Sequence, residues 1–152
     1  MKSILFVCLG NICRSPIAEG YARQVLKEKG FIDIVIDSAG TSAHHIGEHP
    51  CKDSIKVAKA HGVDISHQHS RQVKQSDFTK FDLIVALDES NYQDLKYIGA
   101  THIVKLGSYG YEGADVPDPY YFHDFEGFEK VYEMISHCVT KLLDEEIEAW
   151  TC

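Results

Sequence analysis

Short apolar runs alternate along the chain with segments in which apolar residues recur every three or four positions. The continuous runs are typical of strands buried on both faces, and they cover 3–7, 32–39, 82–87 and 102–105. The periodic segments predict amphipathic helices, and they cover 15–29, 52–61 and 125–150. A further helix is expected to follow 88–91 and to end at about residue 98. Strands that alternate with helices build parallel sheets covered by helices. We therefore expect one α/β domain over residues 1–152, with three layers and a four-stranded parallel sheet.

In such folds ligands bind beyond the carboxyl ends of the strands. The loops that follow the predicted strands are therefore the places to search for a site: 8–15, 40–50, 88–91 and 106–124. The last is long and has no predicted element of its own. Long loops in compact domains are often functional.

Acidic residues outnumber basic ones by 23 to 15, which gives a formal net charge of −8. Binding to nucleic acid or to an anionic membrane needs a basic surface, so we expect neither. A small anionic substrate stays possible because a local pocket can oppose the overall charge. No secretory leader and no membrane-spanning run are predicted. We expect a cytoplasmic protein whose cysteines are mostly reduced thiols: Cys8, Cys13, Cys51, Cys138 and Cys152.

The loop after the first strand predicts an anion-binding site. Cys8 begins it, Arg14 ends it, and Gly10 and Asn11 tolerate the left-handed backbone that turns successive N–H groups inward. Ser15 is expected to cap the following helix and to donate its hydroxyl toward the Cys8 sulfur. The helix dipole attracts anions here, and the arginine fork suits two oxygens of a phosphoryl group. The same positive field stabilises a thiolate at Cys8, which could attack a bound phosphate.

The segment 7–16, Val-Cys-Leu-Gly-Asn-Ile-Cys-Arg-Ser-Pro, resembles the signature of the low-molecular-weight protein tyrosine phosphatases. The resemblance continues in 37–41, 71–73, 88–91 and 118–121. It implies cofactor-free hydrolysis of phosphotyrosine through a phosphocysteine, with Cys8 as nucleophile and Arg14 on the phosphate. It also implies a phosphate-binding loop formed by Leu9, Gly10, Asn11, Ile12, Cys13 and Ser15.

A carboxylic acid that protonates the leaving oxygen is expected on the long loop. Spacing alone leaves Asp115, Asp118 and Asp124 as candidates. The resemblance selects Asp118 as general acid, and then as the base that activates water. It also implies that Tyr120 and Tyr121 contribute to the wall of the substrate pocket.

Further residues correspond to supporting positions of the family. Glu19 and Ser38 are expected to brace the phosphate loop, and Gln68 stands where a histidine often joins that network. Asp88 corresponds to an acidic residue that supports Arg14 or the leaving-group side in the family, or else it caps the next helix. His44 stands where the family often has a large aromatic residue that clamps the substrate ring.

Cysteine and histidine residues raise two further questions. Relatives with a second cysteine at position 13 can form a reversible Cys8–Cys13 disulfide, so we expect redox regulation through that pair. The chain has nine histidines, but their spacings match no standard zinc site, and we expect no metal and no cofactor.

Three other functions compete with this interpretation. A thiol-dependent arsenate reductase would need further cysteines in a relay, and none lies between Cys51 and Cys138. A protein arginine phosphatase tends to have threonine where this chain has Ile12. A non-enzymatic phosphate-binding or redox-sensing module leaves the Asp118 loop unexplained. The expected partners are a phosphotyrosine protein as substrate and phosphate or other oxyanions as inhibitors. Exposed rim aromatics are compatible with a monomer or a weak homodimer.

Overall fold

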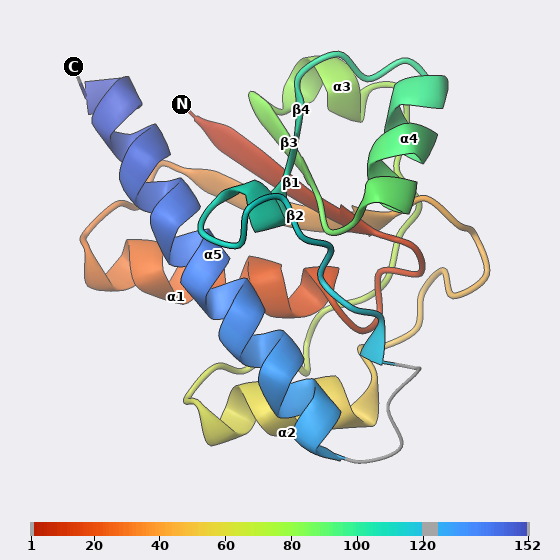
Figure 1. The fold of residues 1–152 in the computed structure, drawn as a ribbon, viewed down its shortest axis with the longest axis vertical. Coiled ribbons are helices and arrows are strands. Elements are labelled where there is room, and N and C mark those ends of the chain that lie inside the picture. Colours follow the sequence, from red (N-terminus) through yellow and green to blue (C-terminus); the bar gives the residue numbers. More distant parts are fainter. Residues whose placement is uncertain (1, 120–124, 152) are drawn as a thin grey trace.

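The computed structural model describes residues 2–119 and 125–151, which form a three-layer α/β domain (Figure 1). The strands are β1 (Ser3–Cys8), β2 (Val35–Gly40), β3 (Leu83–Ala86) and β4 (Ile103–Lys105). The helices are α1 (Ser15–Glu28), α2 (Lys52–Ala60), α3 (Asp77–Lys80), α4 (Glu89–Tyr97) and α5 (Phe125–Thr151), with a short 3₁₀ turn, η1, at Leu106–Ser108.

The four strands pair in parallel in the order β2-β1-β3-β4. The chain leaves β1 for β2 on one side and returns to β3 on the other, so the direction of the connections reverses at β1. A crevice opens at such a point beyond the carboxyl ends of the strands. Cys8, the last residue of β1, lies opposite Gly40 at the end of β2. The sheet thus places Cys8, the predicted nucleophile, beside this crevice. The predicted fold class is confirmed.

Helices cover both faces of the sheet, which explains why β1 is buried along its whole length. Helices α1, α2 and α5 lie on one face and α3 and α4 on the other (Figure 1). Successive side chains of β1 alternate between the two layers, because a strand points its side chains to opposite faces. Ile4 and Phe6 pack under α1 and α5, whereas Leu5 and Val7 pack under α4.

Two local predictions were wrong. Strand β2 begins at Val35 and not at Ile32, whose side chain is 93% exposed, because pairing with β1 starts only where the Val35 amide donates to the carbonyl of Lys2. Helix α1 begins at Ser15, and Arg14 takes the capping position without a side-chain cap. The Ser15 hydroxyl is engaged elsewhere, in the loop described below.

Helix α3 has only four residues and was not predicted. It is held by Asp77, whose carboxylate accepts the Lys74 amide and two hydrogen bonds from the Arg71 guanidinium. Arg71 also pairs with Asp37 on β2, and Gln72 forms an isolated parallel bridge with Gly40. The segment 71–73 therefore extends the sheet beyond β2. Its contacts join residues far apart in the sequence, which a local pattern does not reveal.

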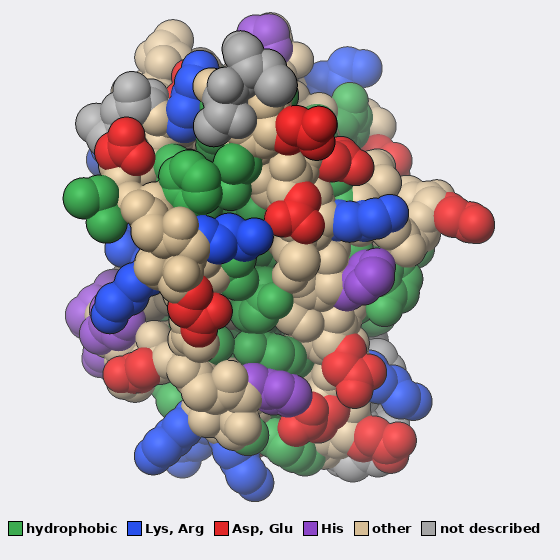
Figure 2. Space-filling view, turned by 90° about the vertical axis from the view of Figure 1, so that its left-hand side faces the viewer, with side chains coloured by type: hydrophobic (Ala, Val, Ile, Leu, Met, Phe, Trp, Pro, Cys, Tyr) green, Lys and Arg blue, Asp and Glu red, His purple; other side chains and the backbone are tan. Residues whose placement is uncertain are grey.

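Charges of both signs are interspersed over the face of the domain shown in Figure 2, where red and blue side chains alternate without separating into one-sided regions. Among the helices in the described ranges, none combines the length and apolar character needed to cross a membrane.

Candidate active site

The loop between β1 and α1 turns its carbonyl oxygens outward. Residues from neighbouring segments donate to these oxygens: Thr41 N to Cys8 O (3.0 Å), Ser42 N to Leu9 O (2.9 Å), Ser70 Oγ to Gly10 O (3.3 Å), Cys51 N to Ile12 O (2.8 Å) and Ser54 Oγ to Cys13 O (2.9 Å). Within residues 2–119 and 125–151, the amides of 9–14 donate to no protein acceptor. Amides left in this way at a helix N-terminus form a cradle for an anion.

Asn11 holds the turn of this cradle. Its backbone has φ of 58°, in the left-handed region that asparagine tolerates. Its Nδ2 donates to Ser15 Oγ (2.8 Å) and Ser38 Oγ (2.9 Å), and its Oδ1 accepts the Arg71 amide (3.0 Å). The buried side chain thus ties the loop to α1, to β2 and to the segment after α2. Asn11 and Ser15 support the loop from behind, and neither lines the cavity in front of it.

Glu19 completes the bracing network. Ser38 Oγ donates to Glu19 Oε1 (2.6 Å), and Glu19 also pairs with Arg23 (3.2 Å). Burial raises the pKa of Glu19, against the opposing effects of Ser38 and Arg23. Gln68, which stands where the family often has a histidine, makes no hydrogen bond to Glu19, Ser38 or Asn11 in the part of the chain that the structure describes. Its Nε2 donates to Pro16 O, and its buried Oε1 has no hydrogen-bond partner within the described residues.

The Cys8 thiol lies at the base of the cradle. It is 1% exposed, and its sulfur is 3.0 Å from Ser15 Oγ. A hydroxyl at this distance can donate to a thiolate, as the sequence predicted for Ser15. The second predicted role of Ser15, capping α1, is the part that the structure contradicts.

Arg14 is fixed at the other end of the loop. Its Nη1 donates to Asp88 Oδ2 (2.7 Å) and to Val116 O (3.0 Å). Asp88 Oδ1 accepts the Asn91 amide (2.7 Å), so Asp88 also caps α4. The contact of Asp88 with Arg14 and its position as helix cap are therefore both observed. Burial lowers the pKa of Arg14, but the negative charges of Cys8 and Asp88 outweigh this, so its pKa lies above the ordinary value.

The structure separates two of the candidate acids. Asp118 lines the same cavity as Cys8 and interacts electrostatically with Arg14. Asp115 points to α4 and β4, where it accepts the Glu89 amide (2.9 Å) and pairs with Lys105 (2.8 Å). The hydrogen bond from Lys105 is the main cause of the lowered pKa of Asp115. Tyr120, Tyr121 and Asp124 lie outside the described residues.

The cavity has a volume of about 330 Å³ and is lined by Cys8, Leu9, Gly10, Ile12, Cys13, Arg14, Ser42, His44, His45 and Asp118. His44 lies in the wall, as predicted. His45 was not predicted. Its ring lies so close to Gly10 that a Cβ there would come within 2.9 Å of His45 Cδ2, and Glu48 pairs with its Nδ1 (2.7 Å). His45 and Glu48 are three positions apart in the sequence, a spacing that does not by itself mark a cavity residue.

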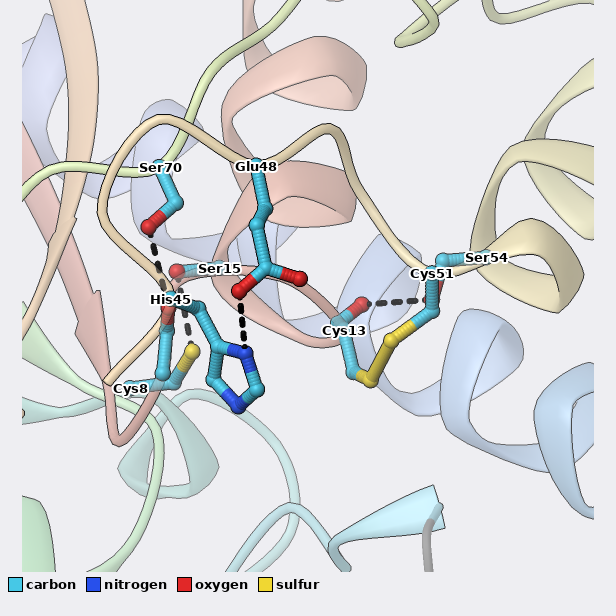
Figure 3. The surroundings of a disulfide bond; sticks show 9 residues. Cys8, Cys13, Ser15, His45, Glu48, Cys51, Ser54 and Ser70 are labelled. Atoms are coloured by element: carbon cyan, nitrogen blue, oxygen red, sulfur yellow. Dashed lines mark hydrogen bonds and ion pairs between the residues drawn. A yellow bond between two sulfur atoms is a disulfide. The ribbon is translucent and has the colours of Figure 1, made fainter.

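The predicted Cys8–Cys13 disulfide is wrong: Cys13 is bonded to Cys51, and Cys8 is a free thiol (Figure 3). In Figure 3 the Cys13 side chain reaches toward the start of α2, whereas the Cys8 sulfur lies beside Ser15. The direction of the Cys13 side chain, toward Cys51 at the start of α2, therefore decides the pairing. The expectation of mostly reduced cysteines therefore holds for Cys8 and Cys138 and fails for this pair.

Gly40 leaves room for the loop. A Cβ on Gly40 would lie 2.6 Å from Leu9 O and 3.0 Å from Gly10 C, both backbone atoms. We expect Gly40→Ala to displace the loop, to lower the free energy of unfolding by about 1–3 kcal/mol and to raise the KM for an aryl phosphate by about tenfold. Kinetics and denaturant unfolding measure the two effects.

Gly62→Ala is the matched control for this change. Gly62 has φ of 81°, and a Cβ at this position would meet no atom within 4 Å, so alanine strains the backbone without touching the loop. It should lower stability and leave KM unchanged. A similar KM for the two variants would contradict the proposed contact between Gly40 and the loop.

Comparisons with known proteins agree with this geometry. The family model for low molecular weight phosphotyrosine protein phosphatase matches residues 3–150. The chain is 39% identical over 148 residues to the low molecular weight protein-tyrosine-phosphatase PtpA of Staphylococcus aureus, covering 95% of this chain and 93% of that protein.

Two solved structures illustrate the range of similar folds. The protein tyrosine phosphatase of Entamoeba histolytica superposes with a TM-score of 0.91 at 34% identity, covering 98% of this chain and 99% of that one. The arginine phosphatase of Drosophila superposes with a TM-score of 0.88 at 31% identity, covering 96% and 98%. With its Cys8–Arg14 cradle at the end of β1 and a family match over nearly its whole length, the chain belongs to the low-molecular-weight phosphotyrosine protein phosphatase family.

Proposed function

We propose that the protein hydrolyses phosphotyrosine in proteins and that Cys8, Arg14 and Asp118 carry out the chemistry. The Cys8 thiolate attacks phosphorus, the bond from phosphorus to the tyrosine oxygen breaks, and Asp118 protonates that oxygen. The products of this first step are the phosphocysteine and the dephosphorylated tyrosine side chain of the substrate. The Asp118 carboxylate then takes a proton from water, the water oxygen attacks phosphorus, and the sulfur–phosphorus bond breaks to release inorganic phosphate.

The outward orientation of the loop carbonyls is the observation that carries this proposal. It leaves a row of amides around the Cys8 sulfur without acceptors among the described residues. Preorganised N–H donors stabilise charge that develops on the phosphoryl oxygens, without reorganisation at the moment of reaction. The same donors bind inorganic phosphate, so we propose that phosphate and other oxyanions inhibit the enzyme by competition.

Arg14 supports the same step from the other side. Its hydrogen bonds to Asp88 and to Val116 O both use Nη1. Among contacts within the described residues, Nε and Nη2 of Arg14 have no acceptor, so they are available for two phosphoryl oxygens. Asp88 therefore sets the orientation of the guanidinium without competing for the edge that faces the phosphate.

The position of Cys8 favours aryl phosphates. The thiol is almost fully buried beneath walls that include Ile12, His44 and His45. A phosphate on an aromatic ring reaches such a thiol, whereas the short side chain of phosphoserine leaves the peptide backbone in collision with the rim. Where the family often has a large aromatic residue in the wall, this chain has His44, and the rings of His44 and His45 can carry charge.

A comparison of three peptides of identical sequence tests this proposal. They carry phosphotyrosine, phosphoserine or phosphoarginine, and we expect kcat/KM for phosphotyrosine to exceed the other two by about a hundredfold. Phosphate release is measured, and Cys8→Ser is the control with each peptide. Faster turnover of phosphoarginine would instead support an arginine phosphatase, the activity named for the Drosophila relative.

We also propose a cytoplasmic location and a monomer or weak homodimer. A free, catalytic Cys8 thiol is best preserved in a reducing compartment.

Leu9 and Ile46, in the two loops that border the cavity, are 49% and 58% exposed. A small apolar rim of this kind suits contact with a substrate or a weak contact between copies.

A further inference from the structure

The first turn of α2 holds the part of the phosphate loop that contains Ile12 and Cys13. The Cys51 amide donates to Ile12 O (2.8 Å), and Ser54 Oγ donates to Cys13 O (2.9 Å). The disulfide joins Cys13 to Cys51 across 38 residues of sequence (Figure 3). Two hydrogen bonds and one covalent bond therefore fix the same two residues of the loop.

These three links act on the direction of the loop amides. When the Ile12 and Cys13 carbonyls are bound on the side of α2, the peptide planes turn their N–H groups away from α2. Cys13 also lines the catalytic cavity, so the link reaches the wall of the phosphate site itself. We propose that Cys51 and Ser54 are positioning residues for phosphate binding, and that the Cys13–Cys51 dithiol–disulfide couple tunes the affinity of the site. This inference rests on the proposed phosphate-binding role of the loop.

The redox chemistry needs only a low-molecular-weight disulfide such as oxidised glutathione. The Cys51 thiolate attacks one sulfur of that disulfide, which forms a mixed disulfide and releases one thiolate. The Cys13 thiolate then attacks the Cys51 sulfur, closes the protein disulfide and releases the second thiolate. Two protein thiols lose two electrons and the small disulfide gains them. Cys51 is the more accessible partner, so the small disulfide reaches it first.

Oxidation of this pair leaves the nucleophile untouched. The Cys8 sulfur contacts Ser15 and is buried, and its thiol is free in the same structure that contains the disulfide. The oxidised protein is therefore the form with the better organised cradle, and it keeps the thiol needed for catalysis. This is the opposite outcome from a disulfide that contains Cys8 and blocks it. Disulfides that respond to redox conditions are also the type expected in reducing compartments.

Equilibration of the whole enzyme in glutathione buffers tests the proposal. Alkylation and peptide mapping identify the state of the pair, and an aryl phosphate gives kcat and KM. Closing the disulfide should lower KM and the inhibition constant of inorganic phosphate by about fivefold. It should change kcat by less than about twofold, because an interaction that is equally strong in the ground state and the transition state changes KM and leaves kcat unaffected. Linkage requires the reciprocal effect: saturating phosphate should make the disulfide harder to reduce by the same factor.

Three variants separate positioning from general stability. Cys51→Ser keeps the backbone amide and should behave like the reduced protein in every buffer. Ser54→Ala should raise KM in both redox states, because the buried Cys13 carbonyl loses its donor. Cys138→Ala is the control, because Cys138 is a buried cysteine on α5 that does not line the cavity, and it should respond to the buffers as the wild type does.

Two results would overturn the inference: a KM and phosphate inhibition that do not change with the state of the pair, or an oxidised form that loses kcat because Cys8 has entered a disulfide. Failure of the proposed function gives a different result. In that case the wild type does not hydrolyse the aryl phosphate in any buffer, although phosphate binding can still be measured in both redox states.

Discussion

Cys8→Ser is expected to lower kcat for phosphotyrosine by about 10⁴-fold or more, because the hydroxyl is a far weaker nucleophile than the thiolate and the first bond to phosphorus does not form. The change is small in volume, and the outward hydrogen bonds of the loop involve the Cys8 carbonyl and not its side chain. The variant should therefore fold and bind inorganic phosphate nearly as well as the wild type. Steady-state kinetics and calorimetric phosphate titration measure the two properties.

Cys138→Ala provides the matched cysteine control for this experiment. Burial raises the pKa of the Cys138 thiol to about 11, and Cys138 does not line the cavity. Its removal should leave kcat within about twofold of the wild type. Substantial turnover by Cys8→Ser would refute the phosphocysteine mechanism, and loss of phosphate binding in the same variant would show that Cys8 also supports the cradle.

Asp118→Asn is expected to lower kcat/KM for phosphotyrosine peptides by about 10²–10⁴-fold, the usual contribution of a general acid. The amide keeps the size of the side chain and removes the proton that the tyrosine oxygen needs. An aryl phosphate whose phenol is already acidic leaves without that proton, so its first step should be much less affected. The measurement is therefore a comparison of two leaving groups in a rapid-mixing experiment that detects the released phenol.

The neighbouring Asp115→Asn is the control for Asp118. Asp115 lies three residues earlier on the same loop, but it binds Lys105 and the Glu89 amide. It should keep the leaving-group dependence of the wild type. An equal loss for both leaving groups in Asp118→Asn would assign Asp118 to binding and not to proton transfer.

The prediction of the fold succeeded because the apolar pattern is governed by burial. β1 is buried on both faces and reads as an uninterrupted apolar run, whereas α5 is buried on one stripe and reads with helical spacing. Errors occurred where local pattern and pairing disagree. Ile32 is apolar, yet it lies outside the paired strand. Helix α3 depends on contacts of Asp77 with Arg71, which the hydrophobic periodicity of the sequence does not predict.

Part of the candidate active site could also be predicted from the sequence. Cys8 and Arg14 belong to one loop of contiguous residues, so their spacing alone predicted that they line one site. Asp118 is different, since three aspartates on the long loop were equivalent by spacing. The contacts of Asp115 with Lys105 and of Asp118 with the Cys8 cavity distinguish two of them.

The sequence by itself determined the alternation of strands and helices, the loop that follows β1 and the cysteine and arginine that this loop contains, because each depends on residues near one another in the chain. Only the tertiary structure decided that Cys13 bonds to Cys51, that Gly40 makes room for Leu9, and that Ser54 binds the Cys13 carbonyl. These contacts connect segments some 30 to 40 residues apart, and the packing of helices on a twisted sheet, which no local pattern encodes, brings them together.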